Sequence, residues 1–186
     1  MPKICIATIK GVAPYSPSRA HEAEKQPKET ADAYEHRTWR EKMHVDAAGD
    51  VFIPAMSWKM AVDAAAKMLG DKIPGKRNAT FTKFFTSGVL VFDNAKLGIK
   101  ADAVEGVRVH ANVDGVRGSG KRVWRIFPQV PEWSTVVKFH VLADEITPDV
   151  FERTLAQAGS FVGIGRFRAE KGGLNGRFIV ERARWE

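Results

Sequence analysis

Short segments in which apolar and polar residues alternate recur along the chain. Alternation predicts β-strands where a segment is rich in β-branched and aromatic residues, because successive side chains of a strand point to opposite faces. The expected strands are 3–11, 34–46, 51–53, 88–92, 134–142 and 178–183. Two further segments, 104–113 and 121–127, are expected to form the arms of one long hairpin, joined by 114–120.

Two other segments have apolar residues at helical spacing. The first begins near Pro54 and ends at Gly70, a proline-to-glycine pattern typical of helix boundaries. The second follows Thr147, an expected N-cap, with Pro148 at its start, and runs to about residue 158. The expected apolar face of the first helix consists of Met56, Trp58, Met60, Val62, Ala64, Met68 and Leu69. We predict that the methionines of this stripe lie in the core.

The order of these elements predicts an α+β fold. A ferredoxin-like or RRM-like antiparallel sheet, with helices on one face, accounts for strand, helix, strand, hairpin, strand, helix and strand in that sequence. A hairpin elaboration of another α+β fold is the alternative. Residues 1–186 are expected to form a single domain with two insertions, the proline-containing loop 12–33 and the hairpin 104–127. So long a loop indicates either a functional segment or disorder.

The charge of the chain favours a polyanionic partner. The net charge is +7 and the sequence pI is about 9.6. Residues 21–50 hold eight acidic and five basic side chains, whereas 108–125 and 166–177 are mainly basic. Positive charge gathered in a few segments binds phosphate with release of counterions, which is typical of nucleic-acid-binding proteins.

Several other classes of protein are not favoured. Cys5 is the single cysteine, so we expect a core thiol in a reducing, cytoplasmic compartment. No apolar run approaches the roughly 18 residues of a membrane span, and we expect no membrane association. The five histidines lack zinc-ligand spacing, so no metal or other cofactor is expected. Segments 70–77 and 115–122 nearly match a P-loop, but arginine stands where a serine or threonine must bind magnesium.

A glycine-rich run at 159–178 carries the strongest functional signal. It interleaves six glycines, four cations and three aromatic residues. Glycines permit close approach of a backbone, arginines and lysines donate to phosphates, and aromatic rings offer stacking surfaces. This combination suits a nucleic acid better than a small metabolite. The alternative is a mobile glycine-rich hairpin with solvated charges.

Two segments resemble a known family. Residues 51–59, Val-Phe-Ile-Pro-Ala-Met-Ser-Trp-Lys, resemble the Ile-Pro-Gly-Ser-Ser-Leu-Lys opening of the first helix in the RAMP superfamily, the RRM-like proteins that form the backbone of CRISPR effector complexes. Ala55 and Met56 replace the usual Gly-Ser. The run 163–177 is similar to the late glycine-rich loop of that superfamily. The resemblance implies an RRM-like core that holds a nucleic-acid strand by its backbone, in a CRISPR complex or in a stand-alone or phage-borne relative.

The functional hypothesis is a non-enzymatic protein that binds single-stranded nucleic acid, RNA or DNA, largely without sequence preference. Several copies are expected to line one strand as a homo-oligomer or filament. The resemblance implies contacts at Ser57 and Lys59 and at the arginines of the glycine-rich run, and helix N-termini in general attract phosphate. The residues expected to contact the strand are Trp39, Ser57, Lys59, Lys76, Arg77, Lys83, Arg117, Lys121, Arg122, Trp124, Arg125, Gly163, Gly165, Arg166, Arg168, Lys171 and Arg177.

Two alternatives belong to other functional classes. One is a metal-independent endoribonuclease, a role known in the RAMP superfamily, with His44 or another histidine as the base. The other is a protein-interaction module that occupies or mimics the position of a CRISPR backbone subunit. The sequence does not distinguish RNA from DNA, because contacts to the 2′-hydroxyl are invisible in it.

Overall fold

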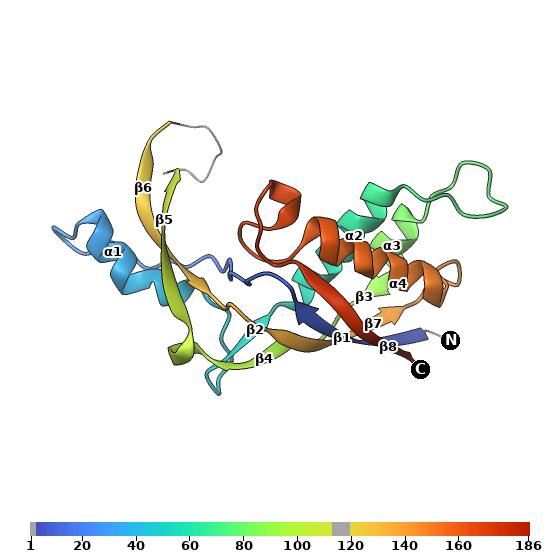
Figure 1. Cartoon of the computed structure of the whole chain (residues 1–186), viewed down its shortest axis with the longest axis horizontal. Coiled ribbons are helices and arrows are strands. Elements are labelled where there is room, and N and C mark those ends of the chain that lie inside the picture. The colour runs from blue at the N-terminus through green and yellow to red at the C-terminus, as the bar shows by residue number, and fades with distance from the viewer. Residues whose placement is uncertain (1–2, 113–119) are drawn as a thin grey trace.

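The computed structural model describes residues 3–112 and 120–186 and contains one principal sheet, a separate hairpin and four α-helices (Figure 1). In chain order the elements are β1 (Lys3–Gly11), α1 (Ala31–Thr38), η1 (Trp39–Lys42), β2 (Asp50–Ile53), α2 (Ala55–Leu69), α3 (Thr82–Gly88), β3 (Val89–Leu90), β4 (Ala95–Lys100), η2 (Ala101–Ala103), β5 (Glu105–Asn112), β6 (Arg122–Gln129), β7 (Ser134–Val141), α4 (Pro148–Gln157), η3 (Ala158–Val162), η4 (Ala169–Lys171) and β8 (Phe178–Trp185).

The principal sheet has the strand order β3-β7-β1-β8, and all neighbours are antiparallel. The units β1–α2–β3 and β7–α4–β8 interleave, so that each helix crosses over one intervening strand. This arrangement is the split βαβ of a ferredoxin-like fold. In Figure 1 the helices α2, α3 and α4 lie on the same side of the sheet. The predicted α+β class, with an RRM-like sheet covered on one face, is confirmed.

The core lies between this sheet and its helices. Alternate residues of β1, namely Cys5, Ala7 and Ile9, are fully buried, as the alternating sequence predicts. Trp58 of α2 packs edge-on against Phe178, with ring centroids 5.4 Å apart. Burial raises the pKa of the Cys5 thiol to about 12, so this thiol stays protonated inside the core. No helix among the described residues is long and apolar enough to cross a bilayer.

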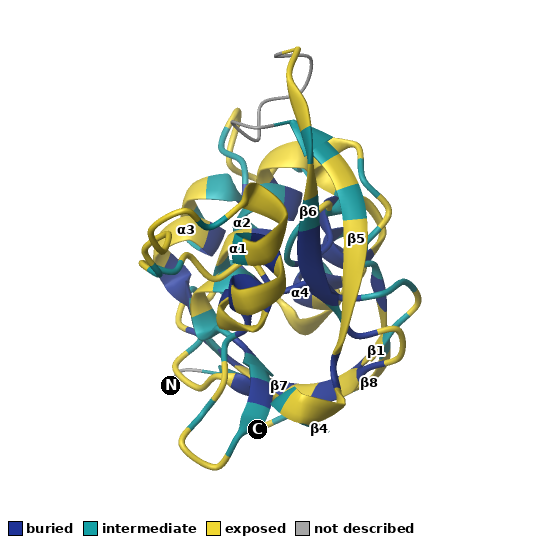
Figure 2. Ribbon diagram, turned by 90° about the vertical axis from the view of Figure 1, so that its left-hand side faces the viewer, coloured by how far each residue is buried: buried dark blue, intermediate teal, exposed yellow. Residues whose placement is uncertain are grey.

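The predicted hairpin is formed by β5 and β6, which pair from Glu105 with Gln129 to Asn112 with Arg122. It extends from the end of the molecule opposite α3, with α1 beside it (Figure 1). Figure 2 shows β5 exposed along most of its length, while the part of β6 nearest the sheet is buried. The expected contact residue Arg117 lies outside the described residues.

The prediction of a strand at 34–46 is wrong, because residues 31–42 form α1 and η1. Thr30 caps α1 by accepting a hydrogen bond from the backbone N–H of Ala33. The buried positions of this segment have helical spacing, but three of the five are polar or charged. A pattern of apolar residues therefore does not reveal the helix. The five buried positions are Glu35, Thr38, Trp39, Lys42 and Met43.

The prediction that the α2 methionines lie in the core is also wrong. Met56, Met60 and Met68 are exposed, whereas the core face of α2 is made by Trp58, Val62 and small alanines. The helical limits are as predicted, since α2 follows Pro54 and ends at Gly70 in the left-handed conformation. The small side chains let the helix lie close to the sheet, and the methionines then fall on the outer face.

We predict that Gly176→Ala lowers the free energy of unfolding more than Gly75→Ala does. Both glycines have positive φ, +69° and +76°, so both substitutions cost about 1 kcal/mol of backbone strain. A Cβ on Gly176 would also lie 1.8 Å from the carbonyl oxygen of Ile164, whereas the space around Gly75 is open. Denaturant unfolding should show a difference of about 2 kcal/mol. Equal stabilities would contradict this account of the glycine-rich loop.

Candidate nucleic-acid interface

A cleft of about 910 Å³, which we call the basic cleft, lies between the hairpin, the extended segment 18–21 and the glycine-rich loop. Its seven cationic lining residues are Arg19, Lys42, Arg122, Arg125, Arg166, Arg168 and Lys171. The described residues that line it include no aspartate or glutamate. Segments far apart in sequence therefore converge on one cation-rich surface, which attracts an anionic ligand. Glu170, beside the cleft, pairs with Arg168 at 2.9 Å and with Lys171 at 3.6 Å.

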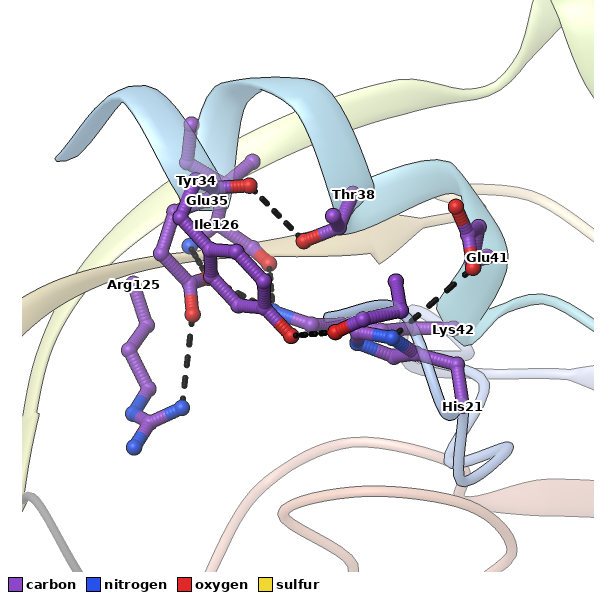
Figure 3. A network of polar contacts seen from close by, with 9 residues as sticks. His21, Tyr34, Glu35, Thr38, Glu41, Lys42, Arg125 and Ile126 are labelled. Carbon is purple, nitrogen blue, oxygen red and sulfur yellow. Dashed lines mark hydrogen bonds and ion pairs between the residues drawn. The ribbon is translucent and has the colours of Figure 1, made fainter. Parts of the chain in front are cut away.

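One buried carboxylate holds the base of the hairpin against α1 and η1 (Figure 3). Glu35 Oε2 accepts hydrogen bonds from Lys42 Nζ at 2.6 Å and from the backbone N–H of Ile126 at 2.9 Å. Glu35 Oε1 accepts one from Arg125 at 3.3 Å. Lys42 Nζ also donates to the carbonyl oxygen of Ile126 at 2.8 Å. This network joins helix to strand and places two of the cleft cations.

Arg166 adds a further charge close to this network. Its guanidinium carbon lies 4.5 Å from the centre of the Phe127 ring, and Lys42 Nζ lies 4.7 Å from the same ring. Arg166 Nε is buried and has no hydrogen-bond partner among the described residues. Burial, followed by the nearby Arg125, lowers the pKa of the Arg166 guanidinium. Burial likewise lowers the pKa of Lys42, and Glu35 opposes that shift.

Among the described residues, the cations at the floor of the cleft outnumber the carboxylates that contact them. Lys42, Arg125 and Arg166 are cationic, and Glu35 is the carboxylate that contacts two of them. An anion in the cleft would accept hydrogen bonds from the guanidinium groups that line it and reduce the repulsion between neighbouring cations. The site therefore has the chemistry of a phosphate-binding surface.

The glycine-rich loop is shaped by contacts within the chain. The backbone N–H of Arg166 donates to the carbonyl oxygen of Ser16 at 2.7 Å, and a Cβ on Gly165 would lie 2.4 Å from that oxygen. The backbone N–H of Gly176 donates to the carbonyl oxygen of Pro14, two residues before Ser16, at 2.7 Å. These glycines permit close approach of two stretches of backbone. The loop is thereby fixed against segment 14–18, and its Arg166 and Arg168 line the cleft.

The structure brings together several of the residues predicted from sequence. Those that line the basic cleft are Arg122, Arg125, Gly165, Arg166, Arg168 and Lys171. Ser57 and Gly163 line an adjoining cavity of about 240 Å³, which shares Gly165 and Arg168 with the cleft. The exposed Lys121 lies on the hairpin, and Trp124 lies beside His110 with ring centroids 5.0 Å apart.

Other predicted residues have different surroundings. Lys59 is largely buried and donates to Asp63 and to the carbonyl oxygens of Phe85 and Thr86, so it joins α2 to the end of α3. Trp39 is buried, with Arg40 over its ring, and packing accounts for its position. Arg177 donates to the carbonyl oxygen of Ser160 at 2.6 Å.

Three predicted cations lie away from the basic cleft. Lys76 and Arg77 are in the connection between α2 and α3, and Lys83 is in α3, at the opposite end of the molecule from the hairpin (Figure 1). Lys76 pairs with Glu145 at 2.6 Å, and Lys83 lies over the Phe84 ring at 5.1 Å. The structure does not bring these residues together with the arginines of the glycine-rich loop.

Sequence reasoning missed several residues of the cleft. Arg19 lies in the expected loop 12–33, where few apolar residues mark any regular element. Lys42 lies in segment 34–46, which was expected to form a strand. His21 and His110 also line the cleft, whereas His44 does not and packs near Phe52 with centroids 5.7 Å apart. The sequence signal for the cleft was the excess of cations in separated segments. That these segments converge on one surface depends on tertiary structure and could not be predicted from the pattern.

Comparison with known proteins supports the fold assignment. No family model and no curated protein matches the chain. A chain in the cryo-EM structure of the Type III-B Cmr-beta bound to cognate target RNA is similar, with a TM-score of 0.58 and 11% identity, over 99% of this chain and 60% of that chain. This protein thus spans about 60% of the length of that relative.

Two further structures are similar at lower scores. Cmr6 from Pyrococcus furiosus has a TM-score of 0.47 and 14% identity, over 95% of this chain and 97% of that one. A chain of a CRISPR RNA-guided surveillance complex has a TM-score of 0.44 and 12% identity, over 98% and 68%. The fold shared with the Cmr-beta chain agrees with the RRM-like α+β architecture that the sequence predicts.

We predict that Glu35→Gln lowers the free energy of unfolding by about 3 kcal/mol, since it leaves Lys42 buried without its carboxylate. Adding Lys42→Met to this variant should restore part of the loss, because the uncompensated buried charge is then removed. Denaturant unfolding of the two single variants and the double variant measures this coupling. Strictly additive effects would show that the pair does not act as a unit.

Proposed function

We propose that this protein binds a single-stranded nucleic acid in the basic cleft, mainly through the phosphate backbone and without enzymatic turnover. The observation that carries the proposal is the convergence of seven cations on a cleft whose described lining has no carboxylate. Phosphate contacts are independent of base identity, so such a site binds largely without sequence preference. The similar Cmr-beta chain belongs to a complex bound to cognate target RNA, which supports a nucleic-acid ligand and a CRISPR-related role.

The distribution of the cations favours a strand over a small anion. Arg19, Arg122 and Arg166 come from three different segments around the cleft. A single phosphate is satisfied by two or three charged donors, whereas successive phosphates of a strand use donors spread along a surface. Several copies of the protein are expected to line a longer strand, and the mass of complexes with short and long oligonucleotides tests that part of the proposal.

A second candidate is a metal-independent endoribonuclease. It is favoured by one observation, that His21 and His110 both line the cleft and so lie where a strand would bind. Incubating labelled RNA with the protein in the presence of a chelator tests it. Cleavage that is lost in both His21→Gln and His110→Gln would support nuclease activity, and intact RNA would support a protein that only binds.

We predict that changing Arg166 and Arg168 together to Ala weakens binding of a single-stranded oligonucleotide by about 1 to 3 kcal/mol, because charged hydrogen bonds to phosphate are lost. Stability should be nearly unchanged. The half-buried Arg166 lies among other cations and lacks a partner on Nε, and the partly exposed ion pair of Arg168 with Glu170 contributes little. Fluorescence anisotropy and thermal unfolding measure the two effects. Unaltered affinity in the folded variant would contradict the site.

A matched control is Arg77→Ala with Lys83→Ala, which removes the same charge from the opposite end of the molecule. This control should keep nearly full affinity if the cleft is the site. Equal weakening by both double variants would instead indicate binding by overall charge.

Affinity should also fall steeply with added salt. For single strands, log K changes with log salt by about −0.7 for each neutralised phosphate. Loss of Arg166 and Arg168 should therefore make the slope shallower by about 1.4, whereas the control variant should keep the slope of the unchanged protein. A flat titration of the unchanged protein would contradict the electrostatic part of the proposal.

A further inference from the structure

Phe167 has a backbone conformation that its residue type disfavours. Its φ is +56°, and Lys28 is the other non-glycine residue with positive φ in the described part of the chain. Bulky side chains are rare in this region because Cβ approaches the following carbonyl group. Glycine would adopt it without strain, and the surrounding loop is rich in glycine. The presence of phenylalanine at this position therefore needs an explanation.

The fold of the loop accounts for the backbone conformation but not for the side chain. The carbonyl oxygen of Phe167 accepts a hydrogen bond from the N–H of Asn175 at 3.0 Å, and Gly173 lies directly against it. These contacts involve backbone atoms, and glycine at 167 would preserve them. The Phe167 side chain remains 40% exposed, so core packing does not require it.

The ring lies where a strand in the cleft would pass. Phe167 lines the basic cleft between Arg166 and Arg168 in sequence. Its ring meets that of Phe127 edge to face, with centroids 5.3 Å apart and planes at 82°. Phe127 in turn lies under Arg166. An exposed aromatic ring between phosphate-binding cations is the arrangement by which proteins hold unpaired bases.

We propose that Phe167 is a stacking platform for one unpaired base of the strand in the basic cleft. This inference rests on the proposed function and specifies the form of the ligand. A base in a duplex already stacks on its neighbours, so a platform of this kind selects single-stranded segments. Every base has a π-face, so stacking adds affinity with little sequence preference. Contact of the ring with a base accounts for phenylalanine at a position where the backbone favours glycine.

The test compares Phe167→Leu, Phe167→Tyr and Phe167→Gly with the unchanged protein. Leu keeps the apolar bulk without a ring, Tyr keeps the ring, and Gly relieves the positive φ. We expect Leu and Gly to weaken single-strand binding about 5- to 150-fold, the range for loss of one stacked base, and Tyr to retain it. The midpoint of thermal unfolding of Phe167→Gly should not fall below that of Phe167→Leu.

A second measurement reports stacking directly. A single-stranded oligonucleotide carrying 2-aminopurine should lose fluorescence on binding to the unchanged protein, and less so on binding to Phe167→Leu. Binding of a duplex of the same sequence should change little between the two proteins. An equal loss of affinity for single strand and duplex would overturn the platform.

The outcomes separate this inference from the proposed function. If Phe167→Gly is folded and binds a single strand like the unchanged protein, while Arg166 and Arg168 are required, the platform is wrong and the cleft remains the site. If neither set of substitutions alters binding, the proposed site itself is wrong.

Discussion

The basic cleft depends on the buried carboxylate of Glu35. A carboxylate away from water is tolerated when charged and backbone donors surround it, and here Lys42, Arg125 and the N–H of Ile126 do so. Because these partners belong to η1 and to β6, one side chain fixes where the hairpin begins relative to α1. The same contacts place Lys42 and Arg125 at the cleft. The hydrogen bonds that hold the hairpin against α1 and η1 therefore also position the cations of the cleft.

Among the described residues, three cations, Lys42, Arg125 and Arg166, gather around the carboxylate of Glu35 at the floor of the cleft. Phe127 partly offsets the repulsion between these cations, since Lys42 and Arg166 both lie over its ring and gain a cation–π contact. The buried Nε of Arg166 still lacks an acceptor among the described residues. A phosphate in the cleft would reduce the repulsion between these cations. Such partly unsatisfied sites cost folding stability and are typical of binding surfaces.

Much of the fold could be predicted from sequence, because its elements have strong local signals. Alternation in β1, the proline and glycine at the ends of α2 and the Thr147 cap of α4 each depend on nearby residues. The α1–η1 segment could not be predicted, since its buried helical face is built from Glu35, Thr38 and Lys42. These polar residues are buried because of partners distant in sequence, such as Ile126.

The candidate site was predictable to a similar degree. The cations of the glycine-rich run were recognisable from composition, and the structure places Arg166, Arg168 and Lys171 in one cleft. Lys59 matched a family motif, yet its partners at the end of α3 give it a packing role. The glycines of the loop turn out to serve contacts between stretches of backbone. Phe167 then stands out by contrast, since it is a bulky residue where the backbone favours glycine. In a loop so closely fitted to itself, the position that departs from the requirements of folding is the one to examine for contact with a ligand.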